Sequence, residues 1–304
     1  MSLESGGRAD KIGNSYENRY LAKLLLRLVE ETYTSVEVEP LGTENDGVEY
    51  ITTSSDGSRI YYQCKASNGP ESKWTFAPLR DLNVFDNARK HVIDSTDHYY
   101  HFISPIPYDE LDTLCDRARM NHSPHDFVSH QLTNPKLRSY FAKLEEYWSL
   151  SRDNPTELTQ LVSILSRCYF ELVPNSRDYV NDLESYAGRC FIGKSETICY
   201  TLENCVHTNR WYGKQLTPAQ VVDYMAAQGF PYRNYGADSR ILPRIQELNT
   251  TFWGNYTPIN GVLFPRKASD AAIAHLKNGK SVVLHGRAGV GKSGCAEEII
   301  NNTT

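Results

Sequence analysis

Apolar and polar positions along the first hundred residues follow two periodicities. Leu21, Leu24, Leu25 and Leu28 recur at helical spacing, which predicts a helix over residues 14–32. Shorter segments rich in β-branched and aromatic residues follow, as is typical of strands. The resulting prediction is strands over residues 35–42, 47–53, 58–65 and 98–104, a hairpin turn at Ser55-Asp56-Gly57, and a helix over residues 78–92.

The remainder of the chain has a mostly helical pattern. Residues 107–210 and 217–229 predict helices, and the Pro- and Gly-rich stretch 254–265 predicts a linker. A helix over residues 268–277 and a strand over Ser281–Leu284 come next. The predicted domains are residues 1–210, an α/β unit with a helical extension, residues 211–265, a helical linker, and residues 266–304, the beginning of another α/β domain.

Composition indicates a folded protein that does not enter membranes. Hydrophobic residues make up 40% of the chain and charged residues 23%. No apolar run approaches the roughly 20 residues that a membrane span needs, and the N-terminus lacks the apolar core of a secretory signal. The seven scattered cysteines are typical of reduced thiols. We therefore expect a cytoplasmic protein.

A phosphate-binding motif lies near the C-terminal end. Residues 286–293 match the pattern G-x-x-x-x-G-K-[ST], between an apolar strand and a helix. Gly286, Gly289 and Gly291 would let backbone N–H groups face the phosphates of ATP. Lys292 would reach the β- and γ-phosphates, and Ser293 would bind Mg²⁺. The sequence predicts a P-loop for ATP–Mg²⁺.

Few residues follow this motif, although a P-loop NTPase needs further strands and an acidic residue for Mg²⁺. We therefore expect the chain to be the N-terminal part of a longer NTPase, and we expect no ATP hydrolysis from these residues alone.

A second group of polar residues lies in the first predicted domain. Gln63 and Lys65 are two apart on a strand and share a face, and hairpin pairing predicts Asp46 beside them. Glu17 lies on the apolar stripe of the first helix, where an unpaired carboxylate is costly. Glu17, Asp46 and Gln63 are candidate Mg²⁺ ligands, and Lys65 is a candidate for orienting or activating a water.

This constellation resembles the PD-(D/E)-x-K nuclease superfamily, whose core has the order α-β-β-β-α-β predicted above. The segment is also similar to the dsDNA endonuclease domain associated with bacterial antiphage systems. The resemblance implies a restriction-endonuclease-like fold and catalysis by Asp46, Gln63, Lys65 and Glu17. Gln63 replaces the usual second acid, and Glu17 and Glu49 are candidates to compensate. Glu49 is the weaker because its strand parity is opposite to that of Asp46.

A nuclease-like domain ahead of a P-loop resembles the antiviral STAND NTPases of the Avs family. That resemblance implies a Mg²⁺-dependent nuclease that degrades double-stranded DNA when a C-terminal sensor recognises a viral protein and the protein forms a homo-oligomer, with a tetramer as one option.

Two alternatives from other classes stay open. Gln63 is compatible with a DNA-binding module whose catalytic site is inactive. The net charge of −5 is compatible with a module that only assembles the NTPase, because DNA-binding proteins usually carry a basic surface. Taken singly, a turn aspartate and a strand-end lysine are commonly structural.

Overall fold

The computed structural model describes residues 4–66, 72–93, 95–108, 110–233, 241–254, 266–278, 280–287 and 289–302. The chain divides into two compact units, residues 1–233 and 234–304, and each is described by itself. None of the helices within these ranges is both long and apolar enough to cross a bilayer.

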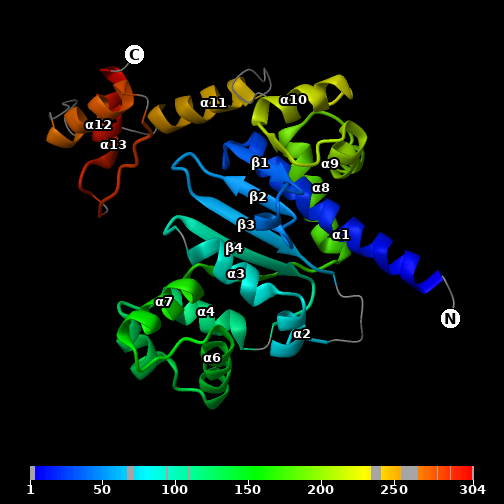
Figure 1. Ribbon diagram of the computed structural model, residues 1–304. Helices are drawn as coiled ribbons and strands as arrows, with labels where there is room; N and C mark the ends of the chain where they lie inside the picture. The colour runs from blue at the N-terminus through cyan, green and yellow to red at the C-terminus, as the bar shows by residue number, and fades with distance from the viewer. Residues whose placement is uncertain are drawn as a thin grey trace. The chain divides into compact units, whose positions relative to one another are not determined.

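The first unit is built on a mixed β-sheet (Figure 1). Six strands of the described residues form it in the order β5-β4-β3-β2-β1-β6. Strands β3, β4 and β5 run parallel, whereas the pairs β2–β3, β1–β2 and β1–β6 are antiparallel. The strands are β1 (Ser35–Val38), β2 (Tyr50–Thr53), β3 (Arg59–Cys64), β4 (His98–Ser104), β5 (Cys168–Leu172) and β6 (Lys214–Leu216).

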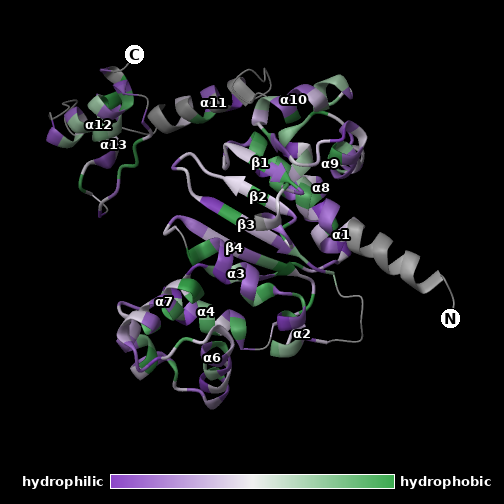
Figure 2. Ribbon diagram, viewed as in Figure 1, coloured by the Kyte–Doolittle hydropathy of each residue, from purple (hydrophilic) through white to green (hydrophobic). Residues whose placement is uncertain are grey.

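Helices cover both faces of this sheet. One face packs against α1 (Glu4–Val29), α8 (Arg177–Cys190), α9 (Ser195–Asn209) and α10 (Pro218–Ala227). The other packs against α2 (Phe76–Asp81), α3 (Val84–Ile93), α4 (Leu111–Arg119), α6 (Pro135–Trp148) and α7 (Pro155–Ser166). Hydrophobic and hydrophilic segments alternate along α4, α6 and α7 (Figure 2). The predicted mixed α/β class is confirmed.

Strand alternation divides the buried residues between two cores. Tyr62 and Cys64 belong to the core under α1, whereas Tyr61 between them belongs to the core under α3. This is the period of two that a strand buried on both faces requires. Gln63 therefore projects toward the α3 face.

Several predicted elements differ from the observed ones. The single helix predicted over residues 78–92 is two helices, because Asn83 has a φ of 57° between α2 and α3. Residues 168–172, predicted as helical, form β5 beside β4. β6 and α10 lie beyond the predicted domain boundary at residue 210, yet they belong to the first unit. The sequence analysis missed β5 and β6 because neither segment has a strand pattern of its own.

The second unit contains α11 (Ile241–Gly254), α12 (Lys267–Lys277) and α13 (Lys292–Asn301). Ala272, Cys295 and Ile299 form a small core between α12 and α13. The strand predicted over Ser281–Leu284 is wrong, because residues 280–287 have no regular secondary structure. A strand exists only through its ladder partner, and none pairs with this segment among the described residues. Residues 255–265 of the predicted linker lie outside the described residues.

Candidate functional site

A buried ion pair lies where β2 begins and β3 ends. Lys65 Nζ donates a hydrogen bond of 2.7 Å to Glu49 Oε1, and the Cys64 backbone N–H donates one of 2.8 Å to Glu49 Oε2. The Glu49 side chain is only 10% exposed and that of Lys65 31%. Backbone bonds hold the two strand ends in register, because the Glu49 N–H donates to the Tyr62 carbonyl at 2.9 Å.

The protonation of this pair is shifted. Burial raises the pKa of Glu49 to about 7, although the Lys65 ammonium and two hydrogen bonds lower it. Burial alone would lower the pKa of Lys65, but the Glu49 carboxylate and then Glu17 raise it. Lys65 is therefore an ammonium at neutral pH, whereas Glu49 exchanges its proton close to neutrality.

Two further carboxylates face the same lysine. Burial raises the pKa of Glu17, Lys65 lowers it, and Glu39 raises it. Burial raises the pKa of Glu39, and Lys65 again lowers it. Tyr50 Oη anchors helix α1 here through a 3.0 Å bond to the Glu17 carbonyl. Glu39 follows β1 with a φ of 47°, and its N–H donates to the Glu49 carbonyl at 2.8 Å.

Asp46 does not join this group in the way that the sequence predicts. It follows the 3-10 turn η1 (Thr43–Asn45), and it is exposed on the loop before β2. Among the described residues it has no ion pair with Lys65. Strand parity does not apply to the comparison of Asp46 with Glu49, because both residues precede β2. Glu49 is the acid that contacts Lys65.

Asp46 and Glu39 instead line an open groove of about 670 Å³ beside the ion pair. The other lining residues are Pro40, Leu41, Gly42, Thr43 and Tyr212.

Gln63, at the end of β3, is buried, with only 2% of the residue exposed. The amide oxygen accepts hydrogen bonds from Asn87 Nδ2, at 3.2 Å, and from Tyr100 Oη. Its nitrogen donates to the Leu82 carbonyl at 3.4 Å. Two donors therefore occupy the oxygen that was predicted to bind a metal ion.

Mg²⁺ requires oxygen ligands, and the carboxylates of Glu49 and Glu17 have this chemistry. Within the described ranges, however, no three His, Cys, Asp or Glu side chains are grouped closely enough to hold a metal ion. Lys65 supplies the positive charge beside Glu49 in this arrangement. Both oxygens of Glu49 already accept hydrogen bonds, one from Lys65 and one from the Cys64 N–H.

The second unit contains the predicted P-loop residues. Gly289 and Gly291 have φ angles of 82° and 83°, which only glycine adopts without strain. Lys292 and Ser293 are the first residues of α13, as predicted. Lys292 Nζ donates bonds of 2.8 Å to the carbonyls of Gly286 and Arg287. Ala288 lies outside the described residues.

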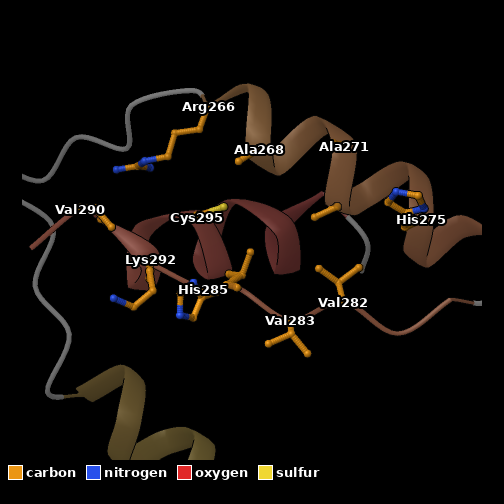
Figure 3. A pocket seen from close by; sticks show the side chains of 13 residues that line it. Arg266, Ala268, Ala271, His275, Val282, Val283, His285, Val290, Lys292 and Cys295 are labelled. Atoms are coloured by element: carbon orange, nitrogen blue, oxygen red, sulfur yellow. The ribbon is translucent and has the colours of Figure 1, made fainter. Parts of the chain in front are cut away.

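A pocket of about 400 Å³ lies next to these residues. Figure 3 shows the side chains that line it. Lys292, Gly291 and Arg266 line it on the polar side, together with apolar residues of α12 and of residues 282–284. Arg266 lies 4.0 Å from Glu298, which also accepts a 2.6 Å bond from Ser269 Oγ. These contacts tie the start of α12 to the helix that the P-loop precedes.

Sequence reasoning did not find Glu39, Asn87 or Tyr100. Asn87 and Tyr100 lie 24 and 37 positions from Gln63, so no local motif connects them. Glu39 comes into place only through the antiparallel pairing of β1 with β2.

Comparisons with known proteins show no family. No family model matches this chain, and no curated protein matches it. Three solved structures that it resembles are Cap4 SAVED/CARF-domain containing receptors. One, from Moraxella osloensis, has 14% identity and a TM-score of 0.40 over 70% of this chain.

The other two come from Acinetobacter baumannii and have 13% identity over 70% of this chain. One of them, with the cyclic trinucleotide 3'3'3'-cAAA, has a TM-score of 0.41, and the second has 0.39. The chain spans 44–46% of the length of these three receptors. TM-scores this low do not establish a shared fold.

Proposed function

We propose that this protein is a Mg²⁺-dependent endonuclease that hydrolyses double-stranded DNA, and that its core is of the restriction-endonuclease-like type. The observation that supports the proposal is the buried Glu49–Lys65 pair at the adjoining ends of β2 and β3, next to Glu17 from α1. An acid just before one strand and a lysine just after the next, together with a third group from the first helix, is similar to the arrangement that the sequence resemblance implies. In this proposal Glu49 takes the place of Asp46.

Each side chain has a role that its protonation permits. Lys65, an ammonium at neutral pH, donates to a phosphate oxygen and stabilises the charge that develops when a phosphodiester is attacked. Glu49 has a pKa of about 7, which suits a group that takes a proton from the attacking water. Glu17 would contribute to binding Mg²⁺, which when bound would polarise the phosphate and lower the pKa of a water.

The P-loop suggests how such an activity is controlled. We propose that the chain is the effector part of a nucleotide-gated antiphage protein, in which a viral protein and ATP–Mg²⁺ promote homo-oligomerisation and cutting. Support for this part comes from the motif at residues 286–293 and from the conformations of Gly289 and Gly291. A DNA nuclease that shares its cell with a genome needs such control.

The test is cleavage of linear double-stranded DNA by the purified full chain in Mg²⁺ or Mn²⁺, with EDTA as the blank. Glu49→Gln and Lys65→Ala are expected to lose cleavage by about 100-fold or more. Asp46→Asn and Lys136→Ala are matched controls, because Asp46 is exposed and the Lys136 side chain is 74% exposed on α6. Cleavage that persists in Glu49→Gln and disappears in Asp46→Asn would overturn the assignment of Glu49.

A second candidate follows from the bonds around Glu49. Both of its oxygens already accept hydrogen bonds, which is compatible with a DNA-binding module of the same fold that lacks catalysis. That candidate predicts a salt-dependent affinity for DNA without cleavage in any divalent metal. The same preparation distinguishes the two by titrating labelled DNA at two salt concentrations.

A further inference from the structure

The position occupied by an acid in most nucleases of the resembled superfamily is Gln63 here, and its amide is buried in hydrogen bonds. Its oxygen has two lone pairs, and two donors use them. A ligand for a metal ion must offer a lone pair toward open space. Gln63 offers none, so its side chain has a different role.

Asn87 connects the two segments that lead into the ion pair. Its side chain is 7% exposed, and it reaches Gln63 on β3 through the 3.2 Å bond. It also packs against Gly47, since a Cβ atom at that glycine would lie 2.4 Å from Asn87 Nδ2. Gly47 is two residues before Glu49, and Gln63 is two residues before Lys65. The side chain of Asn87 thus contacts both chain segments that lead into the Glu49–Lys65 ion pair.

Tyr100 completes the contact from the neighbouring strand. It is fully buried on β4, and its hydroxyl donates to the Gln63 oxygen. β4 also fixes the backbone after β3, because the Lys65 N–H donates to the Ile103 carbonyl at 2.9 Å. The side-chain and backbone bonds together set where Cys64 N–H and the Lys65 side chain point, which are the two donors to Glu49.

We infer that Gln63 is a positioning residue, which Asn87 and Tyr100 lock against α3 and β4 so that Lys65 and Cys64 N–H meet Glu49, and that it is not a metal ligand. The inference rests on the proposed function, in which Glu49 and Lys65 do the chemistry. It explains why an amide serves at this position, because an amide both accepts from Asn87 and Tyr100 and donates to the Leu82 carbonyl. A carboxylate would face that carbonyl without a proton to donate.

Tyr100→Phe and Asn87→Ala separate the two roles, because each leaves Gln63 in place and frees one lone pair of its oxygen. A metal ligand would then be more available, and Mn²⁺ affinity and DNA cleavage would hold or increase. A positioning residue would lose its anchor, so cleavage at saturating Mn²⁺ is expected to fall by about 10-fold or more. Tyr108→Phe is the matched control, since it also removes a buried tyrosine hydroxyl from this unit.

A second readout does not depend on nuclease activity. Acetic anhydride acetylates unprotonated amines, and the Lys65 ion pair with Glu49 protects that amine. The acetylation rate of Lys65 in the folded full chain, followed by peptide mass spectrometry, is expected to rise severalfold in Tyr100→Phe and Asn87→Ala and to stay unchanged in Tyr108→Phe. All variants are compared well below their melting temperatures.

The outcomes decide the two proposals separately. Wild-type labelling rates in both Tyr100→Phe and Asn87→Ala, or cleavage that holds or increases in both, would overturn the positioning role of Gln63. Absence of Mn²⁺ binding to the wild-type chain would instead overturn the proposed metal-dependent nuclease, and the labelling rates would still decide whether Gln63 positions Lys65.

Discussion

Glu49 is placed by its backbone neighbours as much as by Lys65. The Glu49 N–H donates a hydrogen bond to the Tyr62 carbonyl, and the Glu49 carbonyl accepts one from the Glu39 N–H. Both peptide groups of Glu49 are therefore tied to adjacent segments of the chain. The side chain therefore has little freedom to escape burial, and burial raises its pKa. A carboxyl group that is fixed and desolvated beside an ammonium is suited to exchanging a proton near neutral pH.

The pH dependence of cleavage tests this property. Burial raises the folded-state pKa of Glu49 from 4.5 to about 7, so the folded chain binds this proton more tightly than the unfolded chain does. The contribution of this carboxyl group to stability is thus greatest below pH 4.5 and declines as pH rises to about 7. Activity has the opposite sign, because the carboxylate form is needed.

We expect the cleavage rate to rise with pH through about 7 and then to level off. The Asp46→Asn variant is expected to show the same pH dependence. The rate is measured at saturating metal between about pH 5.5 and 8.5, a range of about three units around that pKa. A cleavage rate that instead rises around the ordinary pKa of glutamate would show that Glu49 does not control the rate.

At this scale the sequence predicts the residue types better than their partners. Glu17 raises the pKa of Lys65 in addition to Glu49, and both Glu17 and Lys65 were candidates because strand parity and the helical stripe are local properties. Asp46 was placed wrongly because the loop before β2 contains a 3-10 turn, and the strand begins only at Tyr50. The partners of Gln63 depend on how α3 and β4 pack, which no local pattern specifies.

The elements around the site depend on close backbone approaches. The loop from η1 into β2 passes α3 so closely that Gly47, with a φ of 81°, has no room for a side chain. Gly57 in the β2–β3 hairpin has a similar φ of 86°, but nothing lies within 4 Å of a Cβ atom built there. The two glycines therefore separate backbone strain from steric conflict.

Gly57→Ala is expected to lower the free energy of unfolding by about 1 kcal/mol, the cost of a left-handed alanine. Gly47→Ala is expected to cost more, because its Cβ would also collide with Asn87. Adding Asn87→Ala to Gly47→Ala should recover part of the free energy of unfolding that is lost to the collision. It should recover none of the part that is lost to the left-handed backbone conformation. Urea denaturation of the four proteins measures these differences. Equal losses for the two glycine variants would contradict the close approach.

Strands β5 and β6 show what element-level prediction misses. Residues 168–172 continue the apolar pattern of α7, and the strand forms because β4 offers an open edge for parallel pairing. β6 has only three residues, and it is stabilised by antiparallel pairing with β1. In contrast, β4 was predicted with its observed bounds, because its seven residues are rich in aromatic and β-branched side chains.

For the whole molecule, the chain forms two units with separate cores. The first contains both large clusters that sandwich the sheet, and it includes every residue of the Glu49–Lys65 site. The core of the second consists of Ala272, Cys295 and Ile299, with a few partly buried neighbours. The difference implies that the first unit holds most of the stability, because stabilisation scales with the apolar area buried.

Residues 1–233 alone are therefore expected to fold, with a melting temperature within about 4 °C of the same transition in the full chain, a shift that corresponds to roughly 1 kcal/mol for a unit of this size. Circular dichroism and differential scanning calorimetry measure it, and acetylation of Lys65 reports whether the ion pair is kept. Lys292→Ala in the full chain is the matched control, because it removes the P-loop lysine and leaves the first unit intact. A fragment that melts without cooperativity would show that the second unit is required for the first to fold, and nucleotide binding at the P-loop would then act on the site through stability.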